Sequence, residues 1–132
     1  MPGRKIEMFT DTEFEHCIPI DAYDDEIAAM VDGDEPLHEL DGKSAVDIQY
    51  DYPLSGKFVL SIDHPTGKTE WTRRELFLAI KSGYERIYAE EEDADLTDEA
   101  GPYGIWGHDI GDLVVEMVHI KPNAPIKLSI GS

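Results

Sequence analysis

The feature that most constrains this sequence is a period of two, in which large apolar residues occupy every second position over 45–52 and again over 57–63. A period of two places every second side chain on one face of a β-strand, so each run predicts a strand with one buried face. The tetrapeptide Pro-Leu-Ser-Gly between the runs is typical of a turn, and the pair therefore predicts an antiparallel β-hairpin. The residues of its buried face are Val46, Ile48, Tyr50, Phe58, Leu60 and Ile62.

A helix is predicted directly after this hairpin, over residues 73–91. Its start carries a capping box, in which the Thr72 hydroxyl accepts from the Glu75 amide and the Glu75 carboxylate accepts from the Thr72 amide. Apolar side chains then recur at spacings of three and four, and we expect this stripe to cover the apolar side of the hairpin. The three glutamates at 90–92 oppose the negative end of the helix dipole, so the last turn is expected to fray. The stripe consists of Leu76, Phe77, Ile80, Tyr84, Ile87 and Tyr88.

The flanking segments add a second predicted hairpin and a short helix. Val and Ile are frequent over 113–120, and alternation resumes over 126–130 after a turn with two prolines. This pattern favours two paired strands. Near the N-terminus, Asp21 is suited to cap a short helix over 22–31, whose apolar face includes Tyr23.

These elements predict one acidic α+β domain over residues 1–132. Its expected architecture is an antiparallel sheet built from two β-hairpins, with one long amphipathic helix packed on the sheet and a short N-terminal helix. Residues 1–42 are expected to be peripheral or extended.

Net charge is the strongest compositional signal. The 132 residues carry 29 Asp and Glu against 11 Lys and Arg, for a formal charge of −18. Residues 1–42 hold 13 acids and 2 bases (−11), residues 43–81 hold 5 and 6 (+1), and residues 82–132 hold 11 and 3 (−8). Nucleic acids and anionic membranes would be repelled, so neither is expected as a direct partner. The charge instead favours solubility, a basic protein partner or a cation.

The sequence also carries an expectation about the compartment. It has no run of about 18 apolar residues, which a transmembrane helix needs, and residues 1–10 lack the apolar core of a secretory signal. Cys17 is the one cysteine, so no intrachain disulfide can form. These features predict an intracellular protein, cytoplasmic with a nuclear location left open.

The most distinctive segment is 103–113, which combines three glycines, two large aromatic residues, a histidine and two aspartates. In one interpretation His108, Asp109 and Asp112 form a site for a divalent cation, for which zinc or manganese suits one imidazole and two carboxylates. Candidates to complete that site are Glu116, His64 and His119. In the other interpretation the segment is a structural turn, in which Asp109 caps a single helical turn and Trp106 fills the core.

Other motifs give no support for a specific reaction. Gly42-Lys43-Ser44 and Gly67-Lys68-Thr69 end like a phosphate-binding loop, but each lacks the glycine five positions earlier. Residues 93–104 lack the glycine and the final glutamate of an EF-hand. Adjacent residues on an extended strand point to opposite faces, so Cys17 and His16 cannot form a catalytic pair there. No catalytic residue and no cofactor beyond a divalent cation is therefore predicted.

Three functions remain open, and the leading hypothesis is a non-enzymatic interaction protein that docks on a basic protein partner. In this hypothesis Tyr103 or Trp106 supplies an aromatic anchor, and Glu90, Glu91 and Glu92 belong to the acidic face that steers association. The first alternative is a cation-dependent hydrolase centred on His108, Asp109 and Asp112. The second is a mimic of nucleic acid that occupies DNA-binding proteins.

Overall fold

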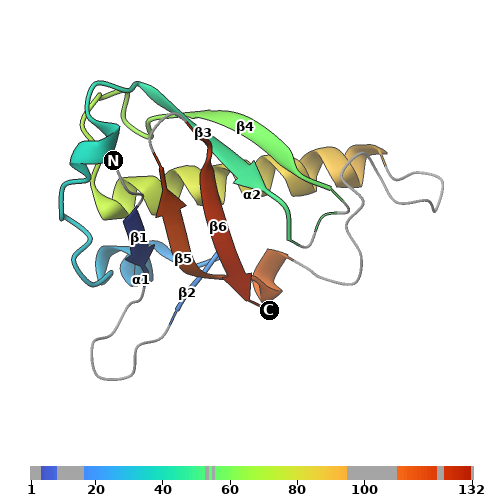
Figure 1. Cartoon of the computed structure of the whole chain (residues 1–132). Coiled ribbons are helices and arrows are strands. Elements are labelled where there is room, and N and C mark those ends of the chain that lie inside the picture. Colours follow the sequence, from blue (N-terminus) through green and yellow to red (C-terminus); the bar gives the residue numbers. More distant parts are fainter. Residues whose placement is uncertain are drawn as a thin grey trace.

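A computed structural model of the chain describes residues 4–8, 17–52, 54, 56–94, 110–121 and 124–131. In this part of the chain a mixed six-stranded sheet has one long helix, α2, packed across one of its faces (Figure 1). The predicted α+β class is therefore confirmed.

The elements follow one another in an order that keeps the two predicted hairpins intact. The sheet runs β1-β5-β6-β3-β4, and β2 also pairs with β5. In chain order the elements are β1 (Arg4–Glu7), β2 (Ile18–Pro19), α1 (Asp24–Ala28), the 3-10 turn η1 (His38–Leu40), β3 (Ala45–Tyr50), β4 (Phe58–Asp63), α2 (Arg73–Ala94), the 3-10 turn η2 (Ile110–Asp112), β5 (Val114–Ile120) and β6 (Ile126–Gly131).

The sheet differs from the predicted pair of simple hairpins. β3 pairs antiparallel with β4, and β5 pairs antiparallel with β6, as the alternation predicted. The two hairpins are joined by a parallel pairing between β3 and β6, with Ile48 opposite Ile126. β1 and β2 both pair antiparallel with β5, outside either hairpin. A wholly antiparallel sheet was the wrong expectation, because pairings between strands distant in sequence leave no local periodic signal.

α2 begins as predicted and ends later than predicted. The Thr72 amide donates to Glu75 Oε1 at 2.9 Å, and the Glu75 amide donates to Thr72 Oγ1 at 3.2 Å, which completes the capping box. The helix continues to Ala94, three residues beyond the predicted end. One turn before this end, Arg86 and Glu90 form an i,i+4 ion pair at 3.2 Å, and such a pair stabilises a helix by about 0.2–0.5 kcal/mol.

The apolar stripe of α2 and one face of the sheet form the core. Five of the six predicted stripe residues are buried, and Tyr88 is half-buried. The N-terminal segments contribute to the same core through Ile6, Met8, Ile18, Ile20, Ile27, Met30, Leu37 and Leu40.

α1 differs from the helix predicted over 22–31. It has five residues, and its N-cap is Tyr23 in extended backbone rather than Asp21. Because Tyr23 precedes the first turn, its side chain leaves the predicted apolar face and is 77% exposed. The chain after α1 then reaches α2, where the Leu37 amide donates to the Trp71 carbonyl at 2.7 Å.

Ile80 provides a direct test of the packing of α2 on the sheet. It is fully buried at the middle of the stripe. We expect Ile80→Ala to lower the free energy of unfolding by about 2–5 kcal/mol, through lost burial and the cavity left behind. Urea denaturation measures the change, and a loss below about 0.5 kcal/mol, which is typical of surface sites, would contradict this packing.

Gly83 is required by a close approach between α2 and β3. A β-carbon built on Gly83 would overlap the hydroxyl oxygen and Cζ of Tyr50. The Tyr50 hydroxyl is held there because it donates to the Ile80 carbonyl at 3.1 Å, and its ring meets Tyr84 edge-on at 4.7 Å. Burial raises the pKa of both tyrosines, so the two hydroxyls stay neutral at ordinary pH.

This contact reverses the usual effect of replacing a helical glycine. Gly→Ala inside a helix normally stabilises by about 1 kcal/mol. We expect Gly83→Ala instead to destabilise the fold by up to about 2 kcal/mol, since overpacking a core costs about 1–3 kcal/mol and exceeds the gain in helix propensity. Ser82→Ala, one residue earlier and exposed, is the matched control and should stay within about 0.5 kcal/mol in the same denaturation series. A stabilised Gly83→Ala variant would contradict the observed approach.

Candidate functional site

The structure does not describe the side chains of most residues that were predicted to form a site. Tyr103, Trp106, His108 and Asp109 lie outside the described part of the chain, and Glu91 and Glu92 are in α2 with side chains that are not described. Their roles stay predictions.

Two of the predicted site residues have described side chains. Asp112 is exposed and is the third residue of η2, which lies where a single helical turn after Asp109 was expected. Glu90 is exposed on α2 and pairs with Arg86.

The described candidates for additional metal ligands are not brought together. Glu116 and His119 are on β5, and His119 Nε2 lies 3.4 Å from Ser129 Oγ. His64 follows β4, which is separated from β5 by β6 and β3, a span of about 14 Å at the usual strand spacing. Among the described residues, no group of three or more His, Cys, Asp or Glu side chains is arranged to hold a metal ion.

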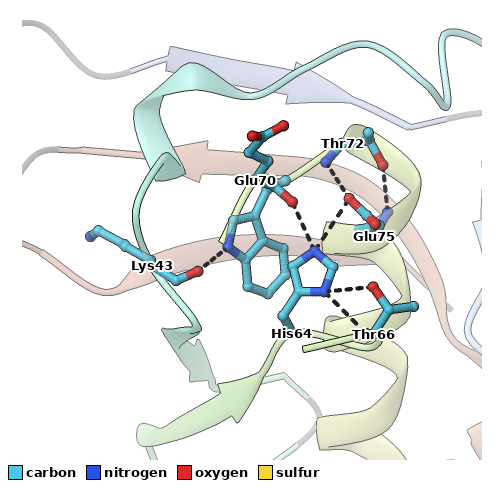
Figure 2. A network of polar contacts seen from close by, with 7 residues as sticks. Lys43, His64, Thr66, Glu70, Thr72 and Glu75 are labelled. Carbon is cyan, nitrogen blue, oxygen red and sulfur yellow. Dashed lines mark hydrogen bonds and ion pairs between the residues drawn. The ribbon is translucent and has the colours of Figure 1, made fainter. Parts of the chain in front are cut away.

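His64 instead belongs to a buried polar network at the start of α2 (Figure 2). Its Nε2 donates to the Glu70 carbonyl at 2.8 Å and lies 3.3 Å from Glu75 Oε1. Its Nδ1 accepts from the Thr66 amide at 3.0 Å. Both ring nitrogens thus have hydrogen-bond partners, and the side chain is fully buried. His64 therefore connects the turn after β4 to the start of α2 and does not face solvent.

Trp71 completes this network. Its ring packs edge-on against His64 at a centroid distance of 4.5 Å, and its Nε1 donates to the Lys43 carbonyl at 2.7 Å (Figure 2). The network therefore ties the segment before β3 to the segment before α2.

The hydrogen bond from Trp71 is expected to matter for stability. Trp71→Phe keeps a large buried ring but removes this hydrogen bond, and a typical intramolecular hydrogen bond contributes about 0.5–1.5 kcal/mol. Lys43→Ala is the matched control, because it removes an exposed side chain and keeps the carbonyl. Thermal and urea unfolding should show a loss for Trp71→Phe alone; equal, near-zero changes in the two variants would contradict this role.

The largest described concentration of exposed carboxylates surrounds α1. Residues 17–42 contain nine Asp and Glu and no Lys or Arg. Tyr23 stands among them as an exposed aromatic ring. We define the α1 acidic surface as Asp21, Tyr23, Asp24, Asp25 and Asp34, all of which are exposed.

An open cavity of about 380 Å³ lies beside this surface. Asp24 and Asp34 line it on the α1 side, and Leu78 lines it on the α2 side. Ile27, Ala28 and Arg74 complete its wall. The cavity thus combines carboxylates with apolar side chains.

Arg74 fixes the geometry of the α1 acidic surface. Its Nε donates to the Ile27 carbonyl at 2.9 Å and its Nη2 to the Ala28 carbonyl at 3.0 Å, at the C-terminal end of α1. Its Nη1 forms an ion pair with Asp34. A β-carbon at Gly33 would overlap Arg74 Nη2, so a larger residue there would require this guanidinium to move.

The acidic segments 1–42 and 82–132 come into contact at the edge of the α1 acidic surface. Asp21 packs against Gly111 so closely that a β-carbon added to this glycine would lie 2.9 Å from Asp21 Oδ2. Next to this contact, the Ile20 amide donates to the Leu113 carbonyl at 2.9 Å. η2 with Asp112 therefore adjoins the segment that leads into α1. This contact brings carboxylates from residues 1–42 and 82–132 together beside β5.

Cys17 lies directly before β2 and is half-buried. Burial raises the pKa of its thiol, and the nearby carboxylates of Glu116 and Glu7 add to the rise. The protonated thiol is a weak nucleophile.

Sequence reasoning missed Tyr23 as a surface residue. Its spacing from Ile27 matched an apolar helical face, but the two aspartates that follow it were a signal of a solvent-exposed helix start.

Comparisons with protein-family models, with curated proteins and with solved structures found no match to this chain. Within the described ranges, none of the helices has the length and apolar composition needed to cross a membrane.

Proposed function

We propose that this protein is a non-enzymatic interaction protein that docks on a basic protein partner through the α1 acidic surface. The observation that carries the proposal is the exposed ring of Tyr23 within a surface of carboxylates. Tyrosine is one of the residues that most often dominate binding energy at interfaces, because a large ring is desolvated while its hydroxyl keeps a polar contact.

The electrostatic part of the proposal rests on an excess of negative charge, since residues 17–42 contain nine Asp and Glu and no Lys or Arg, and Arg74 pairs with Asp34. Exposed ion pairs contribute about 0–1 kcal/mol each, so the carboxylates add modest affinity. Their main effect is to accelerate encounter with a cationic partner, and salt screens that effect. The rigid hold of Arg74 on α1 supports the proposal further, because a surface fixed before binding loses little entropy on association.

The cavity beside Asp24 and Asp34 fits the same class of partner. A lysine or arginine side chain has an aliphatic stem and a cationic head. Leu78 and Ile27 suit the stem, and the carboxylate of Asp24 suits the head.

Two variants distinguish the contribution of the Tyr23 ring to the lifetime of the complex from the contribution of the carboxylates to the rate of association. Tyr23→Ala should speed dissociation of the partner, with the association rate little changed. Asp24→Asn with Asp25→Asn should slow association and flatten its dependence on salt. The partner is first captured from a lysate of the source cells with the full chain as bait, and its kinetics are then measured by surface plasmon resonance.

Tyr52→Ala is the matched control, since Tyr52 is a second exposed tyrosine, at 38%, that lies outside the α1 acidic surface. Binding that is indifferent to salt between about 50 mM and 500 mM, where the Debye length falls from above 10 Å to about 4 Å, would contradict electrostatic docking. Loss with Tyr103→Ala and not with Tyr23→Ala would place the anchor in the segment around residue 103 instead. Capture of DNA-binding proteins that release their DNA would favour the nucleic-acid mimic.

A further inference from the structure

β4 is an edge strand whose outer side has no partner among the described residues. It pairs with β3 on one side and ends the strand order β1-β5-β6-β3-β4. Figure 1 shows it at the outer side of the sheet. Free edges of this kind are ready templates for another strand.

The pairing register identifies which backbone groups point outward. The His64 amide donates to the Ser44 carbonyl at 2.8 Å, which extends the β3–β4 ladder by one pair. In an antiparallel ladder every second residue bonds to the neighbouring strand. Phe58, Leu60 and Ile62 therefore direct their backbone groups to β3. The amides and carbonyls of Val59, Ser61 and Asp63 point away from the sheet.

The side chains along this edge suit a second copy of the strand in antiparallel orientation. With the two Leu60 residues facing each other on a twofold axis, Phe58 lies opposite Ile62 of the second copy. Leu60 and Phe58 are half-buried, so this register covers apolar surface that the single chain leaves exposed.

The same register brings opposite charges together. Lys57 and Asp63 are both exposed, and each Lys57 comes directly opposite Asp63 of the second copy. Val59, which is 50% exposed, comes opposite Ser61. The outward amides and carbonyls also meet in bonded pairs in this register, because Val59 and Ser61 are both outward residues.

Charge elsewhere in the chain makes this edge the favourable place for self-contact. Residues 43–81, which contain β3, β4 and the start of α2, carry 6 bases and 5 acids, whereas the segments before and after them carry −11 and −8. Two copies of so acidic a chain therefore repel least where their β4 strands approach.

We propose that this protein forms a twofold symmetric dimer by antiparallel pairing of β4 with β4 of a second copy, which extends the two sheets into one. A twofold interface uses the same patch on both copies, and the register above is self-complementary in both its apolar and its charged pairs. The proposal is independent of docking at α1.

Sedimentation equilibrium of the full chain tests the proposal between about 10 μM and 1 mM, where weak interfaces assemble. The weight-average mass should rise from that of the 14.8 kDa monomer towards twice this value. Ser61→Pro should hold the mass at the monomer value, because proline removes an outward amide that an edge strand does not need internally. Ser61→Ala is the matched control, since it keeps the amide and should dimerise like the parent chain.

The charge pair gives a second, fold-neutral test. Lys57→Asp should abolish dimerisation by placing two carboxylates opposite each other, and adding Asp63→Lys should restore it with the charges exchanged. A chain that stays monomeric at 1 mM would overturn the proposal. A dimer that survives both Ser61→Pro and Lys57→Asp would overturn it as well, because its interface would lie elsewhere.

Discussion

The rest of this structure depends on how the start of α2 is anchored. The capping box of Thr72 and Glu75 fixes the first turn, and the His64 and Trp71 network joins that turn to the segments before β3 and after β4. Arg73 Nη1, from the same turn, donates to the Glu7 carbonyl at 2.8 Å at the end of β1. One helical turn therefore orients the hairpin and the N-terminal strand relative to the apolar stripe that covers both.

Three cations in the first half of α2 donate to backbone carbonyls inside the fold, whereas the other Lys and Arg side chains that the structure describes are exposed. Arg73 donates to a carbonyl of β1, Arg74 to two carbonyls of α1, and Lys81 to the Ile20 carbonyl at 2.7 Å. Each of these side chains ties an N-terminal segment to α2. Arg73 and Arg74 also pair with Glu35 and Asp34, so the cations that hold the N-terminal segments neutralise part of the negative charge of residues 17–42. The acidity of the α1 acidic surface is thus coupled to the way the N-terminal segments are held.

Local patterns predicted the elements well and their long-range arrangement poorly. The hairpin β3–β4, the helix start at Thr72 and the hairpin β5–β6 each follow from periodicity or capping within about twenty residues of chain. The pairing of β3 with β6 and of β1 with β5 depends on packing between distant segments. Tyr23 shows the same limit at the surface, since its spacing matched a buried face and only the short length of α1 placed it in solvent. The predicted site at 103–109 lies outside the described residues and stays a prediction.

The two proposals reinforce each other because they use different parts of the molecule. β4 is the last strand of the sheet order, beyond β6 and β3, whereas α1 follows β2, which pairs with β5 (Figure 1). A dimer through β4 therefore leaves the α1 acidic surface of each copy accessible. Two such surfaces on one particle raise the effective concentration of the second contact, and a partner with repeated basic segments then gains about 10²- to 10⁴-fold in avidity if its spacing allows both contacts. In that case weak pairing of β4 and weak exposed ion pairs would together hold such a partner, although neither interaction would hold it alone.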